Sequence, residues 1–101
     1  MAKVVKITDK LTSEKPVIEV DGVKYEVNDS LEVVFKFEEA LGSGKLTAMT
    51  GALEIALGKK AFKELKLDKL SVKNFKVWMY AILAAMQDED YETVEARFQN
   101  K

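Results

Sequence analysis

The residues whose types and spacing come nearest to a known chemistry are 42–47, GSGKLT. They match the end of a phosphate-binding loop, in which backbone N–H groups hold phosphates and a hydroxyl binds magnesium. The complete loop needs an earlier glycine at the position of Glu39, and a serine or threonine at the position of Leu46. Because neither is present, the sequence predicts no nucleotide site.

Acidic residues form the other candidate sites. Glu38 and Glu39 are adjacent, but neighbouring side chains on a helix point about 100° apart, so the two would not act together. Residues 88–90 (Asp-Glu-Asp) lack the spacing of a calcium-binding loop, and acidic residues are also typical of the positive end of a helix. The sequence has no histidine and no cysteine, which are the commonest zinc ligands and the usual catalytic bases and thiols. We therefore expect no enzyme, no cofactor and no metal site.

Composition and charge narrow the class of protein further. The 101 residues suffice for one domain, and 48% hydrophobic with 33% charged residues is a globular balance. A net charge of −1 gives no general attraction to nucleic acid or to an anionic membrane. No apolar run is long enough to span a bilayer, and the first residues lack the apolar core of a signal peptide. We expect a soluble, cytoplasmic protein.

The element that must organise the chain is a helix over residues 71–87, with Ser71 as its N-cap. Large apolar residues recur along one side at the spacing of a helix face, namely Phe75, Trp78, Met79, Ile82, Leu83 and Met86. The other side carries the smaller Val77, Ala81, Ala84 and Ala85. A helix that is apolar nearly all round is buried on more than one side, so a second helix of this chain or of a neighbour is expected to approach the small residues.

Partner binding or self-association is therefore the function that the sequence favours most. The candidate surface consists of Val77, Ala81, Ala84, Ala85, Met49, Met79 and Met86, with Met1 as a further adaptable methionine. For Met79 and Met86, packing in the core of the chain is the preferred interpretation.

A β-hairpin is the clearest signal before this helix. In residues 17–27, VIEVDGVKYEV, the pair Asp21-Gly22 is typical of a two-residue turn. That turn sets Val20 opposite Val23, Ile18 opposite Tyr25, and Glu19 opposite Lys24 on the other face. The segment Lys3–Thr8 is β-prone and is expected to be either an added strand or a loose arm.

Residues 31–41 are open to two interpretations. The apolar residues fit a helix with Asp29 as its N-cap and Gly42 at its end. Glu32 would be the reciprocal residue of a capping box with Asp29. The same stretch also alternates as a strand would. We favour the helix, because a cap precedes it and Glu38-Glu39-Ala40-Leu41 continues it.

Three further helical segments follow from the spacing of apolar residues. A helix starting near Leu46 is expected to end at Gly58, and Gly51 inside it suggests a place where something packs closely. A short helix covers Lys59–Leu67, with Phe62 and Leu65 inward. A last helix presents Tyr91, Val94 and Phe98 on one side.

The predicted fold is therefore α+β in a single domain, 1–101. Residues 1–16 are an arm and linker, residues 17–27 a hairpin with a possible third strand, and residues 28–101 a bundle of four to five helices.

Four stretches of the chain resemble one protein family. They are VDGVKYEVNDS (20–30), KFEEALGSGKL (36–46), GALEIALGKKAFKEL (51–65) and DEDYETVEARF (88–98). Together they resemble the small tail assembly chaperones of long-tailed (siphovirus-type) bacteriophages and prophages of Gram-positive bacteria. The resemblance implies a non-catalytic viral protein that binds the tape measure protein, assists tail tube assembly, associates with itself and is absent from the mature virion.

Two other classes stay open. One is a small structural protein of the phage tail or of the head–tail connector. The other is a small DNA-binding regulator that uses the seven lysines between Lys59 and Lys76, although such a charge run is usually a solvated face.

Overall fold

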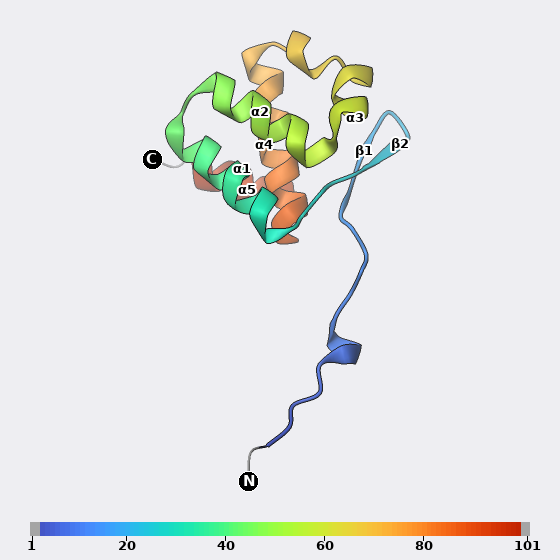
Figure 1. The fold of residues 1–101 in the computed structure, drawn as a ribbon. Helices are drawn as coiled ribbons and strands as arrows, with labels where there is room; N and C mark the ends of the chain where they lie inside the picture. The colour runs from blue at the N-terminus through green and yellow to red at the C-terminus, as the bar shows by residue number, and fades with distance from the viewer. Residues whose placement is uncertain (1–2, 100–101) are drawn as a thin grey trace.

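An antiparallel hairpin opens the folded part of the chain in the computed structural model, which describes residues 3–99 (Figure 1). Strand β1 (Val17–Val20) pairs with β2 (Val23–Glu26) in the predicted register. Asp21 and Gly22 both have positive φ, 51° and 80°, as a type I′ turn requires. The hairpin prediction is confirmed.

The hairpin lies against helices of its own chain. Strand β1 contacts helix α4 (Val72–Gln87), and Ile18 and Tyr25 pack against the core. The Tyr25 hydroxyl donates a hydrogen bond to Glu64 Oε1 at 3.4 Å, and Glu64 ends helix α3 (Lys59–Glu64). The hairpin therefore joins the first part of the chain to two helices that follow it.

Helix α1 (Leu31–Ser43) resolves the ambiguity of residues 31–41, and the strand alternative is wrong. Its N-cap is Ser30, whose hydroxyl accepts from the Val33 N–H at 3.4 Å, and not Asp29 as expected. The reason is a local turn, in which Asn28 Oδ1 accepts from the Ser30 N–H at 3.0 Å and sets Ser30 at the helix entrance.

The end of α1 also differs from the prediction. The helix runs through Gly42 and is capped by Gly44, which takes the left-handed conformation (φ 69°). The Ser43 hydroxyl donates to the Ala40 carbonyl at 2.7 Å and holds this last turn. Gly42-Ser43-Gly44 is therefore mostly helix rather than a flexible joint.

Helix α2 (Leu46–Leu57) ends at Gly58 (φ 87°), as predicted. The next helix is shorter than expected: α3 stops at Glu64, Lys66 is left-handed (φ 53°), and a 3₁₀ turn, η2, covers Leu67–Lys69. Helix α4 begins at its predicted cap, where the Ser71 hydroxyl accepts from the Asn74 N–H at 3.1 Å. Helix α5 (Tyr91–Gln99) follows.

The core lies between these helices, with α4 in contact with α2, α5 and β1 (Figure 1). Within residues 3–98 no polar or charged residue is buried, so apolar packing holds the core. Trp78 is half-buried against this core rather than fully enclosed. The fully buried side chains are Phe37, Leu53, Leu67, Met79, Ile82, Val27 and Val94.

The first residues form an arm that leads away from the helices (Figure 1). We call residues 3–16 the arm; its one regular element is a 3₁₀ turn, η1 (Thr8–Lys10). The segment Lys3–Thr8 does not form a third strand, so the expectation of an added strand is wrong and the expectation of an arm is confirmed. Its apolar side chains are exposed by 80% at Val4, 72% at Val5, 54% at Ile7 and 68% at Leu11.

Candidate partner-binding surfaces

The sequence-predicted partner residues do not form one surface. Met79 and Ala84 are only 1% and 5% exposed, so the core of the chain encloses both. For Met79 this agrees with the preferred interpretation, core packing; for Ala84 the assignment to an accessible surface is wrong. Val77 is exposed. The half-buried members of the set are Ala81, Ala85, Met49 and Met86, and Met1 lies outside the described residues.

Helix α4 explains this distribution. Its neighbours within the chain are α2, α5 and β1, which cover several of its sides. The hairpin and the last helix are therefore among the elements that cover α4 within the chain. Two methionines are nevertheless brought together: Met49 from α2 and Met79 from α4 line the same hollow.

That hollow belongs to a larger surface, which we call the apolar groove. One part, of about 320 Å³, is lined mainly by α2, α4 and α5, and a second part, of about 160 Å³, is lined by α2, η2 and α4. The two parts share Leu46 and Phe75, so they adjoin. The other apolar side chains of the groove are Leu41, Met49, Met79, Tyr80, Phe98, Leu67, Leu70 and Val72.

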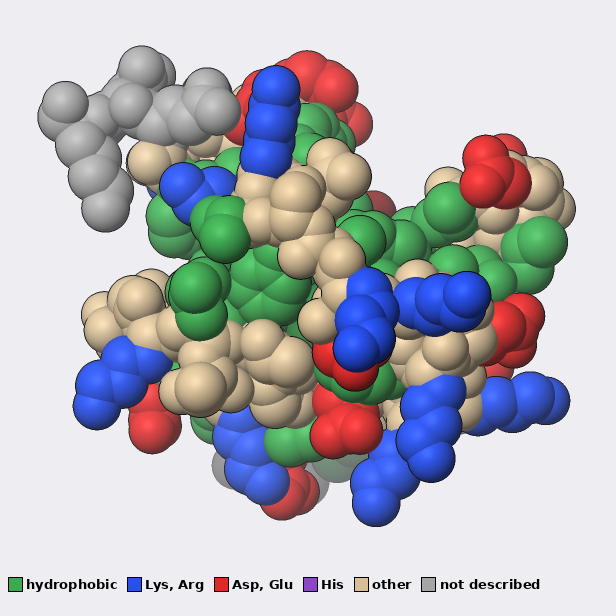
Figure 2. All heavy atoms as spheres, turned by 90° about the horizontal axis from the view of Figure 1, so that it is seen from above, with side chains coloured by type: hydrophobic (Ala, Val, Ile, Leu, Met, Phe, Trp, Pro, Cys, Tyr) green, Lys and Arg blue, Asp and Glu red, His purple; other side chains and the backbone are tan. Residues whose placement is uncertain are grey.

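The groove has a buried floor and an exposed rim. Phe75 and Met79 are 7% and 1% exposed and form the floor, whereas Leu46 and Val72, the first residues of α2 and α4, are 48% and 53% exposed. Figure 2 shows hydrophobic side chains gathered around a hollow on the face seen from above. A long apolar depression of this kind fits the apolar face of a partner helix or an extended apolar segment.

Aromatic packing fixes the α5 side of the groove. The Tyr80 ring stacks on Phe98 with centroids 5.5 Å apart, and it meets the Tyr91 ring edge-on at 6.3 Å. These contacts hold α5 against α4. The methionine pair opposite is more adaptable, because a thioether side chain repacks at little cost.

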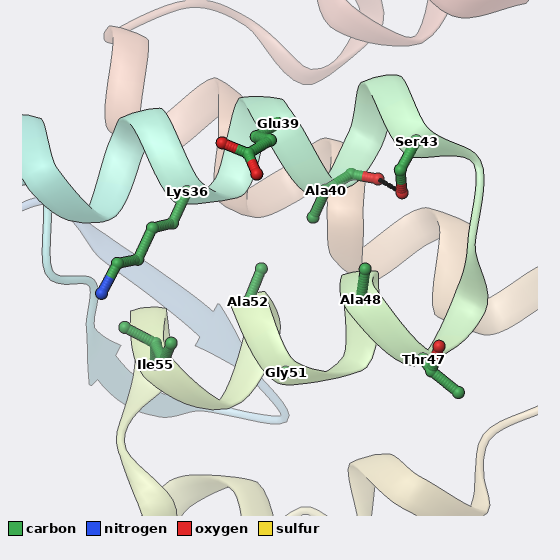
Figure 3. A pocket seen from close by; sticks show the side chains of 9 residues that line it. All are labelled: Lys36, Glu39, Ala40, Ser43, Thr47, Ala48, Gly51, Ala52 and Ile55. Atoms are coloured by element: carbon green, nitrogen blue, oxygen red, sulfur yellow. Dashed lines mark hydrogen bonds between the residues drawn. The ribbon is translucent and has the colours of Figure 1, made fainter.

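A second groove lies between α1 and α2 (Figure 3). It has a volume of about 290 Å³, with buried Ala40 and Ala52 at its floor. Apart from the adjacent residues and the backbone of its own helix, no described atom lies within 4 Å of the place where a Cβ on Gly51 would stand. The close packing expected at this glycine therefore does not occur within the described part of the chain. Lys36 and Glu39 border the groove.

The acidic and glycine-rich stretches have structural roles. Asp88 ends α4 in a left-handed conformation, and the Glu89 N–H donates to the Ala84 carbonyl at 2.9 Å. The Arg97 guanidinium donates to Glu89 Oε2 at 2.6 Å, which ties this turn to α5. In the described part of the chain, no group of three His, Cys, Asp or Glu residues is placed to hold one metal ion. Gly44 and Lys45 form the turn between α1 and α2.

Lysine side chains follow α3 and η2 and reach the apolar groove, which Lys76 borders. All seven lysines from Lys59 to Lys76 are exposed. They lie on α3, on η2 and next to it, and in the first turns of α4. Basic side chains are prominent on the face seen from above (Figure 2). They lie as a solvated face, in line with the preferred interpretation of the charge run.

Comparison of the chain with protein-family models, with curated proteins and with solved structures finds no match. Among the described residues, no helix has the length and apolar character needed to cross a bilayer.

Proposed function

We propose that this chain is a tail assembly chaperone of a long-tailed phage or prophage, which binds the tape measure protein through the apolar groove. The resemblance of four sequence stretches supports the family, and the groove is the observation that carries the binding role. The floor of the groove is buried, but its rim residues Leu46 and Val72 are exposed. Apolar surface therefore remains available for a partner after the core is formed.

The groove suits a helix-rich, apolar partner. A partner helix would place its apolar face over Phe75 and between Leu46 and Val72, and burial of that face from water supplies the affinity. Met49 can adapt to different side chains along a long rod-like protein. In this role the chaperone keeps the tape measure protein soluble in the host cytoplasm until tail tube subunits surround it, associates with itself, and leaves before the virion is complete.

Co-expression with the tape measure protein tests the proposal. Leu46→Glu and Val72→Glu place a charge on the rim and should reduce the soluble tape measure protein. Both residues begin helices, where a carboxylate is favourable, so the fold should be kept. Ile55→Glu is the matched control, since Ile55 is on the same helix as Leu46 and similarly exposed (46% against 48%), but borders the second groove.

The expected result is loss of soluble partner with the two rim variants and no loss with Ile55→Glu, with all three variants folded. Any loss of stability should be largest in the control, because Ile55 lies in the last turn of α2, where a carboxylate is unfavourable. The proposal is overturned if the unmodified chain does not raise the solubility of the tape measure protein. It is also overturned if the chain is recovered as a component of purified virions, which would make it a structural protein.

A further inference from the structure

Strand β2 has a free backbone edge. The Val27 N–H donates to the Pro16 carbonyl at 2.9 Å, and the register places Ile18 opposite Tyr25 and Val20 opposite Val23 as the next bonded pairs. The backbone groups of Lys24 and Glu26, between those pairs, therefore point away from β1. Within residues 3–99 neither residue makes a backbone hydrogen bond outside the hairpin.

Space for another strand exists beside this edge. A hollow of about 510 Å³ is lined by all four residues of β2. Its other wall is formed by Leu57 at the end of α2 and by Lys60, Ala61 and Glu64 of α3. The lining combines apolar carbon with charges of both signs, which an added strand with alternating side chains would match.

The arm supplies a strand of that kind. Val5 and Ile7 are β-branched, exposed and two residues apart, so in an extended chain they share one face while Lys6 lies on the other. If Lys6 stands opposite Glu26 on the charged face of the hairpin, Val5 and Ile7 fall beside Tyr25 and Val27 on the apolar face. The same side chains share a face whether the added strand is parallel or antiparallel to β2. In both cases Lys6 stands opposite Glu26, which is a favourable cross-strand pair of opposite charges.

The geometry points to a specific occupant: residues 4–8 of a second copy of this chain, added as a third strand to the edge of β2, with Lys6 opposite Glu26. The arm of the same copy is attached to β1, on the far side of the hairpin, and residues 9–16 would have to cross both strands to reach β2. Exchange of arms between two copies gives a dimer, and transfer to a third copy gives a ring or filament. The inference deepens the self-association of the proposed function, but it requires no tape measure protein.

Single cysteines provide the test, because the chain has none of its own. A tagged Lys6→Cys chain is mixed with an untagged Glu26→Cys chain and oxidised mildly. Opposite residues of paired strands lie within disulfide reach, so a mixed dimer of the two masses is expected. The matched control is Glu19→Cys, which puts the thiol on the same face of the hairpin but on β1. Each variant alone measures random oxidation.

The expected result is mixed dimer from Lys6→Cys with Glu26→Cys, and only the random level with Glu19→Cys. Equal amounts with both partners, or no mixed dimer above the random level, would overturn the assignment. A double variant with Lys6→Cys and Glu26→Cys in one chain distinguishes binding of the arm to its own β2 from binding to a second copy. A disulfide within a single chain at every dilution would show that the arm folds back on its own hairpin, and would also overturn the assignment.

Charge reversal gives an independent measurement. Lys6→Glu and Glu26→Lys should each weaken self-association by about two- to fivefold, the effect of one cross-strand ion pair. A mixture of the two variants should restore pairing in both directions, because the two introduced side chains face each other in one direction and the unchanged Lys6 faces the unchanged Glu26 in the other. Equal dissociation constants for all these samples by light scattering would contradict the Lys6–Glu26 register. None of these samples contains the tape measure protein, so this inference and the proposed function can fail separately.

Discussion

Two phenylalanines on α1, Phe35 and Phe37, have opposite surroundings. Phe37 is 0% exposed and Phe35 is 61% exposed. Phe37→Ala should therefore lower the free energy of unfolding by about 3–5 kcal/mol, because the change removes buried contacts and leaves a cavity. Phe35→Ala, the same change two residues earlier, should alter it by less than about 0.5 kcal/mol. Urea unfolding of both variants measures the difference, and similar losses would contradict the orientation of α1.

Tyr25 allows a test by pH. The pKa of Tyr25 is raised above the ordinary value of 10.0. The largest cause is partial burial of the side chain; the negative charge of Glu64 and the hydrogen bond to Glu64 contribute less. A raised pKa means that the contribution of Tyr25 to stability is complete below pH 10.0 and is lost as the pH rises through the folded-state value. Glu64→Gln should lower the pKa of Tyr25 toward 10.0, as followed by ultraviolet titration, with Glu54→Gln as control. An unchanged titration would show that the hydrogen bond between hairpin and α3 does not form in solution.

Side-chain placement could be predicted only in part. Nothing in the pattern of residues distinguishes Phe35 from Phe37, because the helical and the alternating pattern both include them. Residues two apart on a helix point in very different directions, so the helix that packs against α1 decides which one is buried. Leu46 and Val72 were not recognised as rim residues, since their exposure depends on how α2, η2 and α4 meet. The burial of Ala84 could not be predicted either, because its position on the small-residue side of α4 does not show which elements pack there.

At the scale of elements, helix α2 contains one glycine, Gly51, and is ended by another, Gly58. Gly58 has φ 87° and ψ 154°, a conformation nearly confined to glycine, whereas Gly51 lies inside α2 with open space where a Cβ would stand. Gly58→Ala should destabilise the protein by about 1–3 kcal/mol. Gly51→Ala should stabilise it by about 0.5–1 kcal/mol, because alanine restricts the unfolded chain and favours the helix.

Thermal unfolding of the two alanine variants would show these opposite signs. A loss of stability with Gly51→Ala would mean that the groove between α1 and α2 is filled in solution, for example by another copy. A neutral Gly58→Ala would mean that α2 and α3 meet differently from the structure.

The order and type of the elements were predictable, and several boundaries were not. The hairpin followed from Asp21-Gly22 and from alternating side chains, and α4 followed from its cap and periodicity. Gly42 and Gly44 are equivalent as sequence signals, yet only Gly44 takes positive φ. The break after Glu64 rests on a left-handed Lys66, a conformation that no local signal at lysine indicates.

For the molecule as a whole, self-association should resist salt. The proposed contact consists of backbone hydrogen bonds and of Val5 and Ile7, with one ion pair between Lys6 and Glu26. Moderate salt screens exposed charges strongly but leaves apolar contacts intact. Light scattering over a range of protein concentrations should therefore show oligomers at low and at high salt, and Ile7→Asp should dissociate them. A monomer at every concentration would contradict the association, and dissociation by salt alone would place it on the lysine and acidic runs.

Neighbours in the sequence are also neighbours in space through most of this fold: β1 lies on β2, α1 on α2, α2 on α3, and α4 on α5. Chains with such local contacts fold within microseconds to milliseconds, because few long loops must close. Ribosomes add about 5–20 residues per second, so synthesis of the 101 residues takes about 5–20 s and far exceeds the folding time. Any chain several times longer, begun at the same moment, would still be emerging from its ribosome when this chain had already folded.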